Sequence, residues 1–202
     1  AVGNPLVKYR VEVANKLSRF LALQRKAIET HISLERELAE LPARIDNQRM
    51  VVKRCGSDLN AYCAFVPTMT KEERARLRAD LANAVENNVL ATTESVFCSY
   101  CGFDIVLPAG MSKEHPYLWL QREGRYYVEL GESGAGYLIR VDNVLEGLQK
   151  HKQKLMDNLE RLLRRQLAVR RELGVEESYT DAIEACRKEL ARLDEILGVD
   201  KK

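Results

Sequence analysis

Apolar residues recur on a seven-residue period in two long stretches of the chain, one near each end. The first row begins at Leu6 and reaches Ile45, and the second runs from Leu145 to Leu173 in steps of three and four residues. This period is typical of helices that pack in a left-handed coiled coil. Each row covers only about two sevenths of its helix, so it must pack against a partner to avoid water. We therefore expect two long helices that pair with each other in antiparallel fashion.

Between these stretches the sequence predicts a small antiparallel sheet. Short β-prone runs alternate there with Gly, Pro and charged turns. They are residues 96–100, 103–107, 117–121, 126–130 and 137–141, and 61–66 fits an edge strand. Arg122-Glu123-Gly124 fits a hairpin turn, and the capping box of Thr70 and Glu73 opens a helix to about residue 87 that packs on the sheet. The predicted fold class is α+β, mostly α: long antiparallel coiled-coil helices flank a small antiparallel sheet with one packed helix.

Capping and helix-breaking residues set the expected boundaries. Asn4 and Pro5 are suited to cap and open the first helix. Pro42 is expected to kink or interrupt it, with a second segment ending near residue 54, because proline removes an amide donor and clashes with the preceding turn. Asp142 is suited to cap the long C-terminal helix. The expected parts are a first coiled-coil arm over 1–60, an α+β head over 61–141, and a second arm with a C-terminal helix over 142–202.

The net charge of +2 hides an uneven distribution. Residues 140–172 carry 9 Lys/Arg against 5 Asp/Glu. Such an excess suits phosphate binding, although a solvated helix face is the commoner explanation. The candidate DNA-binding residues are Lys150, Lys152, Lys154, Arg161, Arg164, Arg165, Arg170 and Arg171.

Several of these cations are spaced to lie on one side of a helix, away from the leucine row. Guanidinium groups there can hold phosphate oxygens in pairs. DNA binding on this side would be independent of sequence and would weaken steeply with salt. The alternative is a solvated face paired in part with Glu160 and Glu172. For the aromatic residues Tyr117, Trp119, Tyr126 and Tyr127 we favour core packing over base stacking.

The five cysteines are expected to be reduced thiols in a cytoplasmic protein. The chain has neither an apolar run of membrane length nor the apolar core of a signal peptide. Cys98-x-x-Cys101 is half of a zinc site, and Cys55 and Cys63 could supply the other half, but their seven-residue gap is long for zinc ligands. Ordinary reduced cysteines are therefore favoured over zinc. We expect no metal, no cofactor and no catalytic site, because no group of residues combines a nucleophile, a base and an orienting residue.

Four segments of the chain are similar in sequence to segments of a known protein family. They are Gly3-Asn4-Pro5-Leu6, the run from Gly102 to Pro108 (GFDIVLP), Tyr127-Val128-Glu129-Leu130-Gly131, and Arg140-Val141-Asp142-Asn143. With these segments the chain resembles the C-terminal region of large proteins of bacterial conjugative elements and phages, which join a DNA methylase to an SNF2-like superfamily 2 helicase. The start at Ala1, without methionine, agrees with a piece of a longer protein.

The resemblance implies a non-catalytic role. The sequence has no GxxxxGK[ST] loop, no DEAD or DEAH box and no NPPY motif. The implied task is to extend or clamp the helicase module on DNA, or to hold a partner. The expected partners are the DNA phosphate backbone, the upstream helicase module of the same polypeptide and a second copy through the coiled coil, without a membrane. The competing hypothesis is a structural coiled-coil module for protein–protein interaction that does not bind DNA.

Overall fold

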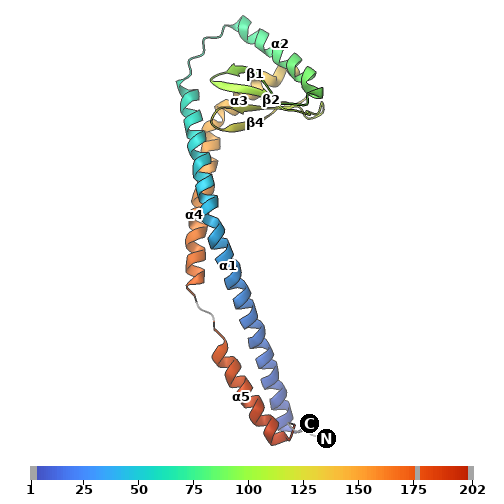
Figure 1. Cartoon of the computed structure of the whole chain (residues 1–202), viewed down its shortest axis with the longest axis vertical. Coiled ribbons are helices and arrows are strands. Elements are labelled where there is room, and N and C mark those ends of the chain that lie inside the picture. Colours follow the sequence, from blue (N-terminus) through green and yellow to red (C-terminus); the bar gives the residue numbers. More distant parts are fainter. Residues whose placement is uncertain (1–3, 176–177, 200–202) are drawn as a thin grey trace. The chain divides into compact units, whose positions relative to one another are not determined.

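The computed structural model describes residues 4–175 and 178–199 and confirms the predicted fold class (Figure 1). Helices α1 and α2 precede a four-stranded sheet, and helices α3, α4 and α5 follow it. The bounds are α1 Pro5–Ala64, α2 Lys71–Asn87, η1 Asn88–Leu90, β1 Ser95–Tyr100, β2 Phe103–Leu107, β3 Tyr117–Gln121, β4 Arg125–Glu129, η2 Gly134–Gly136, α3 Tyr137–Glu146, α4 Leu148–Leu173 and α5 Thr180–Leu197.

The chain divides into two compact units. The described residues up to Ala43 and from Leu162 onward form the first, here called the coil unit, and Arg44–Arg161 form the second, the head unit. The long helices α1 and α4 each contribute to both units. The predicted division into 1–60, 61–141 and 142–202 stays a prediction.

The coil unit is an antiparallel pairing of α1 with α5 and with the end of α4. The ring of Phe20 stacks on that of Tyr179, with centroids 6.3 Å apart, and the Gln24 side chain accepts a 2.8 Å hydrogen bond from the backbone N–H of Tyr179. Nearer the N-terminus, Arg10 pairs with Asp194. Partner numbers rise as α1 numbers fall, so the helices run in opposite directions, as the apolar rows predict.

The sheet of the head unit is an antiparallel meander in the order β1-β2-β3-β4. A two-residue turn joins β1 to β2 at Cys101 and Gly102, which both have positive φ, of 50° and 80°. This is the type I′ geometry that matches the twist of a hairpin. The Arg122–Gly124 turn between β3 and β4 lies where the sequence predicts it.

One face of the sheet carries the core of the head unit. Side chains from β2, β3 and β4 pack there against α2 and α3, and α1 and α4 close the cluster. The fully buried members include Leu81, Phe103, Ile105, Leu118, Leu120, Leu138 and Leu145. The capping box of Thr70 and Glu73 is formed as predicted, so α2 begins where it can cover this face.

The break that the sequence offers at Pro42 as an alternative to a kink is wrong, and so is the helix end near residue 54, because α1 continues through Pro42 to Ala64. Pro42 is exposed, while Leu41 and Ile45 on the adjoining turns are almost fully buried. Packing of these side chains offsets the single backbone hydrogen bond that proline removes. The edge strand expected at 61–66 is also wrong: its first four residues belong to α1, since Tyr62 packs against the core of the head unit.

The β-prone run at 137–141 does not form a strand, since these residues open α3. Leu138, Val141 and Leu145 are all buried, at the helical spacing of three and four residues. Asp142 lies inside α3 and does not cap the long helix. Its carboxylate accepts a 2.8 Å hydrogen bond from the hydroxyl of Tyr100 and pairs with Arg74 of α2. Gly147 separates α3 from α4, which begins at Leu148.

Candidate nucleic-acid interface

In the head unit, three exposed cations lie on one side of α4. Lys150, Lys154 and Arg161 follow one another at spacings of four and seven residues, and all three are exposed. At 3.6 residues per turn their side chains leave the helix within roughly 40° of one another. Leu148 and Leu155 of the same helix are buried or half-buried. The helix therefore presents these cations to solvent while its apolar side packs inward.

Lys152 does not belong to this group. It lies roughly on the opposite side of α4, is half-buried, and the end of its side chain rests against Gly56 of α1. We infer that its methylenes cover apolar surface while its ammonium group reaches water. The structure thus removes Lys152 from the predicted phosphate-binding face.

In the coil unit, Arg165 has a different role from the predicted one. Its guanidinium donates two hydrogen bonds of 2.7 Å to the carboxylate of Glu37 on α1, and one of 3.3 Å to Glu172. This bidentate geometry is the strong form of an Arg–carboxylate pair. Arg165 therefore fastens α4 to α1. Arg164 is also engaged within the chain.

The remaining predicted cations of the coil unit, Arg170 and Arg171, are exposed in the last turn of α4. Over its whole length α4 has eight Lys/Arg against three Asp/Glu. One of the three acids, Asp157, accepts a 2.9 Å hydrogen bond from Gln153. Helix α4 therefore keeps a net positive charge, although two of its eight cations, Lys152 and Arg165, contact α1.

The outer face of the sheet holds an aromatic cluster. The rings of Tyr117, Trp119 and Tyr127 lie 5.2 to 5.9 Å apart, and the Arg125 guanidinium lies 4.6 Å from the centre of the Trp119 ring. Tyr126 points to the other face and is buried, which confirms core packing for this residue, but core packing is wrong for Tyr127, which is 51% exposed on the outer face. Strand alternation separates the two sets, because odd positions of β4 face outward and even positions face the core. We assign the outer cluster to cross-strand packing of the sheet.

A buried carboxylate that sequence analysis missed joins α1 to the sheet. Asp58 has no exposed surface, and it accepts hydrogen bonds from the backbone N–H groups of Glu123 and Gly124, at 3.1 and 2.7 Å, and from the hydroxyl of Tyr126 at 2.7 Å. The interaction holds the β3–β4 turn against the end of α1. In the sequence Asp58 follows Gly56 and Ser57, which resembles a surface turn and gives no sign of burial.

The head-unit cysteines lie on three different elements, and only Cys55 among them is buried. Cys55 and Cys63 lie on α1, Cys98 on β1 and Cys101 in the hairpin turn. Burial raises the pKa of the Cys55, Cys98 and Cys101 thiols above the ordinary value. Across residues 4–175 and 178–199, no three His, Cys, Asp or Glu side chains are grouped so that they could hold a metal ion.

We expect Cys63 to be the first of the head-unit thiols to be alkylated. It is exposed, whereas Cys55 is buried and a raised pKa lowers the thiolate fraction at Cys55, Cys98 and Cys101. At pH 8 and with limiting iodoacetamide, Cys63 should react about tenfold faster than Cys55. Peptide mass spectrometry over a time course measures this order, and modification of Cys55 before Cys63 would contradict it.

Among the described helices none combines the length and the apolar character that a membrane crossing requires. The comparisons with known proteins add no relative: no protein-family model matches the chain, and neither a curated protein nor a solved structure is significantly similar to it.

Proposed function

We propose that this chain is a non-catalytic accessory region that holds the backbone of DNA for a helicase or methylase of a bacterial mobile element. The observation that carries the proposal is the group of three exposed cations, Lys150, Lys154 and Arg161, on one side of α4. Arg170 and Arg171 add exposed positive charge in the last turn of the helix.

The spacing of the three cations suits a phosphate backbone. From Lys150 to Arg161 the helix rises roughly 16 Å, which corresponds to about five base pairs of duplex DNA. The three side chains can therefore contact three of the phosphates that one strand presents over this length. Contacts to phosphates carry no sequence information, so binding through them would be independent of sequence.

The resemblance to helicase–methylase proteins supports the rest of the proposal. The helicase module of the same polypeptide would perform the chemistry in the cytoplasm, and the head unit would dock on it. The three cations of the head unit would then keep DNA close to that module.

A titration of DNA binding tests the proposal. With about three phosphates neutralised, the dissociation constant for a labelled duplex should rise about 40-fold between 50 and 200 mM salt. The combined substitutions Lys150→Glu, Lys154→Glu and Arg161→Glu should weaken binding at least about tenfold and flatten the salt dependence. Fluorescence anisotropy measures both quantities, on duplex and on single-stranded DNA.

The control removes the same charge elsewhere in the head unit. Lys71, Arg76 and Lys113 are exposed and lie outside α4, so replacing all three with Glu should leave most of the binding intact. Equal losses in the two variants would show an effect of net charge alone and refute the assignment to α4. Absence of salt-sensitive binding at micromolar protein would favour the protein–protein interaction module.

A further inference from the structure

Helix α1 carries a second apolar stripe in the coil unit, distinct from the row that packs against α4 and α5. Its members have exposed fractions of 39% to 51%. They are Val7, Val11, Leu21, Ile28 and Ile32. Together with Ala14, Ser18 and Arg25 they repeat in steps of four and three residues, which is the spacing of a coiled-coil seam.

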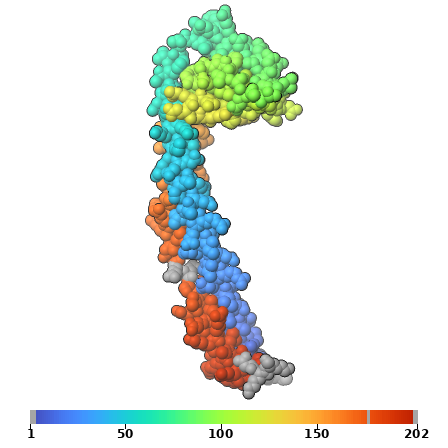
Figure 2. Space-filling view, in the orientation of Figure 1, coloured from blue at the N-terminus to red at the C-terminus, as the bar shows by residue number. Residues whose placement is uncertain are grey.

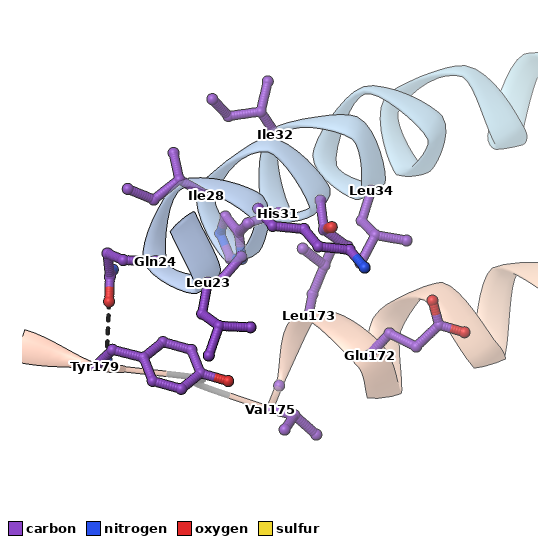
Figure 3. A pocket seen from close by; sticks show the side chains of 14 residues that line it. Leu23, Gln24, Ile28, His31, Ile32, Leu34, Glu172, Leu173, Val175 and Tyr179 are labelled. Atoms are coloured by element: carbon purple, nitrogen blue, oxygen red, sulfur yellow. Dashed lines mark hydrogen bonds between the residues drawn. The ribbon is translucent and has the colours of Figure 1, made fainter. Parts of the chain in front are cut away.

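This stripe lies on a different side of α1 from the row that packs against α4 and α5. In Figure 3 the side chains of Ile28 and Ile32 point to the side of α1 opposite Leu173, Val175 and Tyr179. Figure 2 shows the blue N-terminal part of α1 at the surface of the coil unit, beside the red atoms of α5. A hollow of about 820 Å³ lies between α1 and residues 172–175 and 179, and Ile28 and Ile32 border it.

The coil unit also buries little apolar surface by itself. Among its described residues only Val13, Leu41, Val169, Ile183 and Leu193 are apolar and buried. Small units with so limited a core commonly need a further partner, such as another subunit, to be stable. The second stripe is the surface on which such a partner would fit.

We infer that the occupant of this stripe is a second copy of the chain, with the two α1 helices antiparallel. In this arrangement each position of the stripe lies opposite another position of the same stripe on the partner. Val7 lies opposite Ile32 of the partner subunit, Val11 opposite Ile28 of the partner subunit, and Ser18 opposite Leu21 of the partner subunit. An isologous interface requires this self-complementarity about a twofold axis.

Two charged features select the antiparallel direction. Arg25 lies on the stripe itself, and a parallel, in-register pair would place it against its own copy. In the antiparallel pair it faces the small Ala14 of the partner subunit. Lys8, beside Val7, then lies near Glu29 of the partner subunit, and the twofold axis repeats this attraction. Neither Lys8 nor Glu29 has an ion pair with another described residue.

A charge-swap series tests the pairing by sedimentation equilibrium over 1–100 micromolar protein. The unsubstituted chain should have a dimer mass. Lys8→Glu and Glu29→Lys should each raise the dimer dissociation constant about tenfold, because each creates two like-charge contacts. The double variant, Lys8→Glu with Glu29→Lys, should restore the dimer dissociation constant of the unsubstituted chain. Ile28→Asp with Ile32→Asp should give a monomer, while Met50→Asp, an exposed apolar position of α1 outside the stripe, should remain a dimer.

Cysteine pairing tests the direction. Positions 7 and 32 lie on one continuous helix, so a disulfide between them can form only between chains. A mixture of Val7→Cys and Ile32→Cys chains should form a linked dimer, which neither chain forms alone; Val7→Cys with Leu21→Cys should not. The unsubstituted chain, oxidised in the same way, shows how much linked dimer the native cysteines form by themselves. A monomeric mass would assign the stripe to another protein and overturn the inference, as would links within the Val7→Cys chains alone, which indicate parallel pairing.

Discussion

Replacing Asp58 with Ala should lower the free energy of unfolding by about 3 kcal/mol, because the buried Tyr126 hydroxyl loses a hydrogen bond to a charged group, and one such bond contributes about 1.5 to 3 kcal/mol. The substitution removes the acceptor for two backbone N–H groups of the β3–β4 turn and for the hydroxyl of Tyr126. Water can reach the turn, but the Tyr126 side chain is buried and its hydroxyl would lose its partner. Urea unfolding followed by circular dichroism measures the change.

Two comparisons make this prediction specific to the buried site. Asp58→Asn keeps one acceptor oxygen and should lose about half as much stability. Asp46→Ala, on an exposed turn of the same helix with only a surface pair to Arg49, should change stability by about 0.5 kcal/mol or less. A loss for Asp58→Ala as small as that for Asp46→Ala would show that the carboxylate does not hold the turn.

Phe103→Ala should destabilise the protein by about 4 kcal/mol, the usual effect of removing a large aromatic side chain from a core. Phe103 is 1% exposed at the start of β2 and contacts Tyr126 edge to face, with ring centres 6.1 Å apart. The substitution leaves a cavity beneath the sheet and removes the aromatic pair. The midpoint of urea unfolding should fall without a change in its slope.

The matched control for Phe103→Ala is Val96→Ala on β1. Val96 is 62% exposed, so its truncation should cost about 0.5 kcal/mol or less. A similar effect of both substitutions would mean that the first strand pair does not form as described.

The elements that the sequence predicts correctly are those in which local signals and packing agree. The apolar rows of α1 and α4 predict antiparallel pairing, the capping box predicts the start of α2, and alternating runs predict β1 to β4. Each of these signals operates within a few residues. Tertiary contacts then stabilise the same structure.

The errors have one physical origin, which is that packing overrides local preference. Pro42 and the Gly56–Asp58 segment weaken a helix locally, but α1 passes through both because its neighbouring side chains are buried. Residues 137–141 are β-prone in composition, and only the spacing of Leu138, Val141 and Leu145 distinguishes a helix. The burial of Asp58 has no sequence signal at all.

The predicted interface is recovered in part for a similar reason. Helical spacing separates Lys150, Lys154 and Arg161 from Lys152, so that division was available from the sequence. The pairing of Arg165 with Glu37 joins residues 128 apart, and it depends on the register of α1 against α4. That register comes from packing of the whole coil.

The sheet and the coil unit differ greatly in how far along the chain their contacts reach, and this sets the order in which they can assemble. Adjacent strands of the meander follow one another directly, so the sheet closes through short loops with a small entropic cost. In the coil unit, Gln24 meets Tyr179 across 155 residues. During synthesis the N-terminal part of α1 therefore leaves the ribosome long before α5 does. Until α5 follows, both apolar stripes of α1 are uncovered. In that interval α1 of one nascent chain can pair with α1 of another nascent copy of the chain.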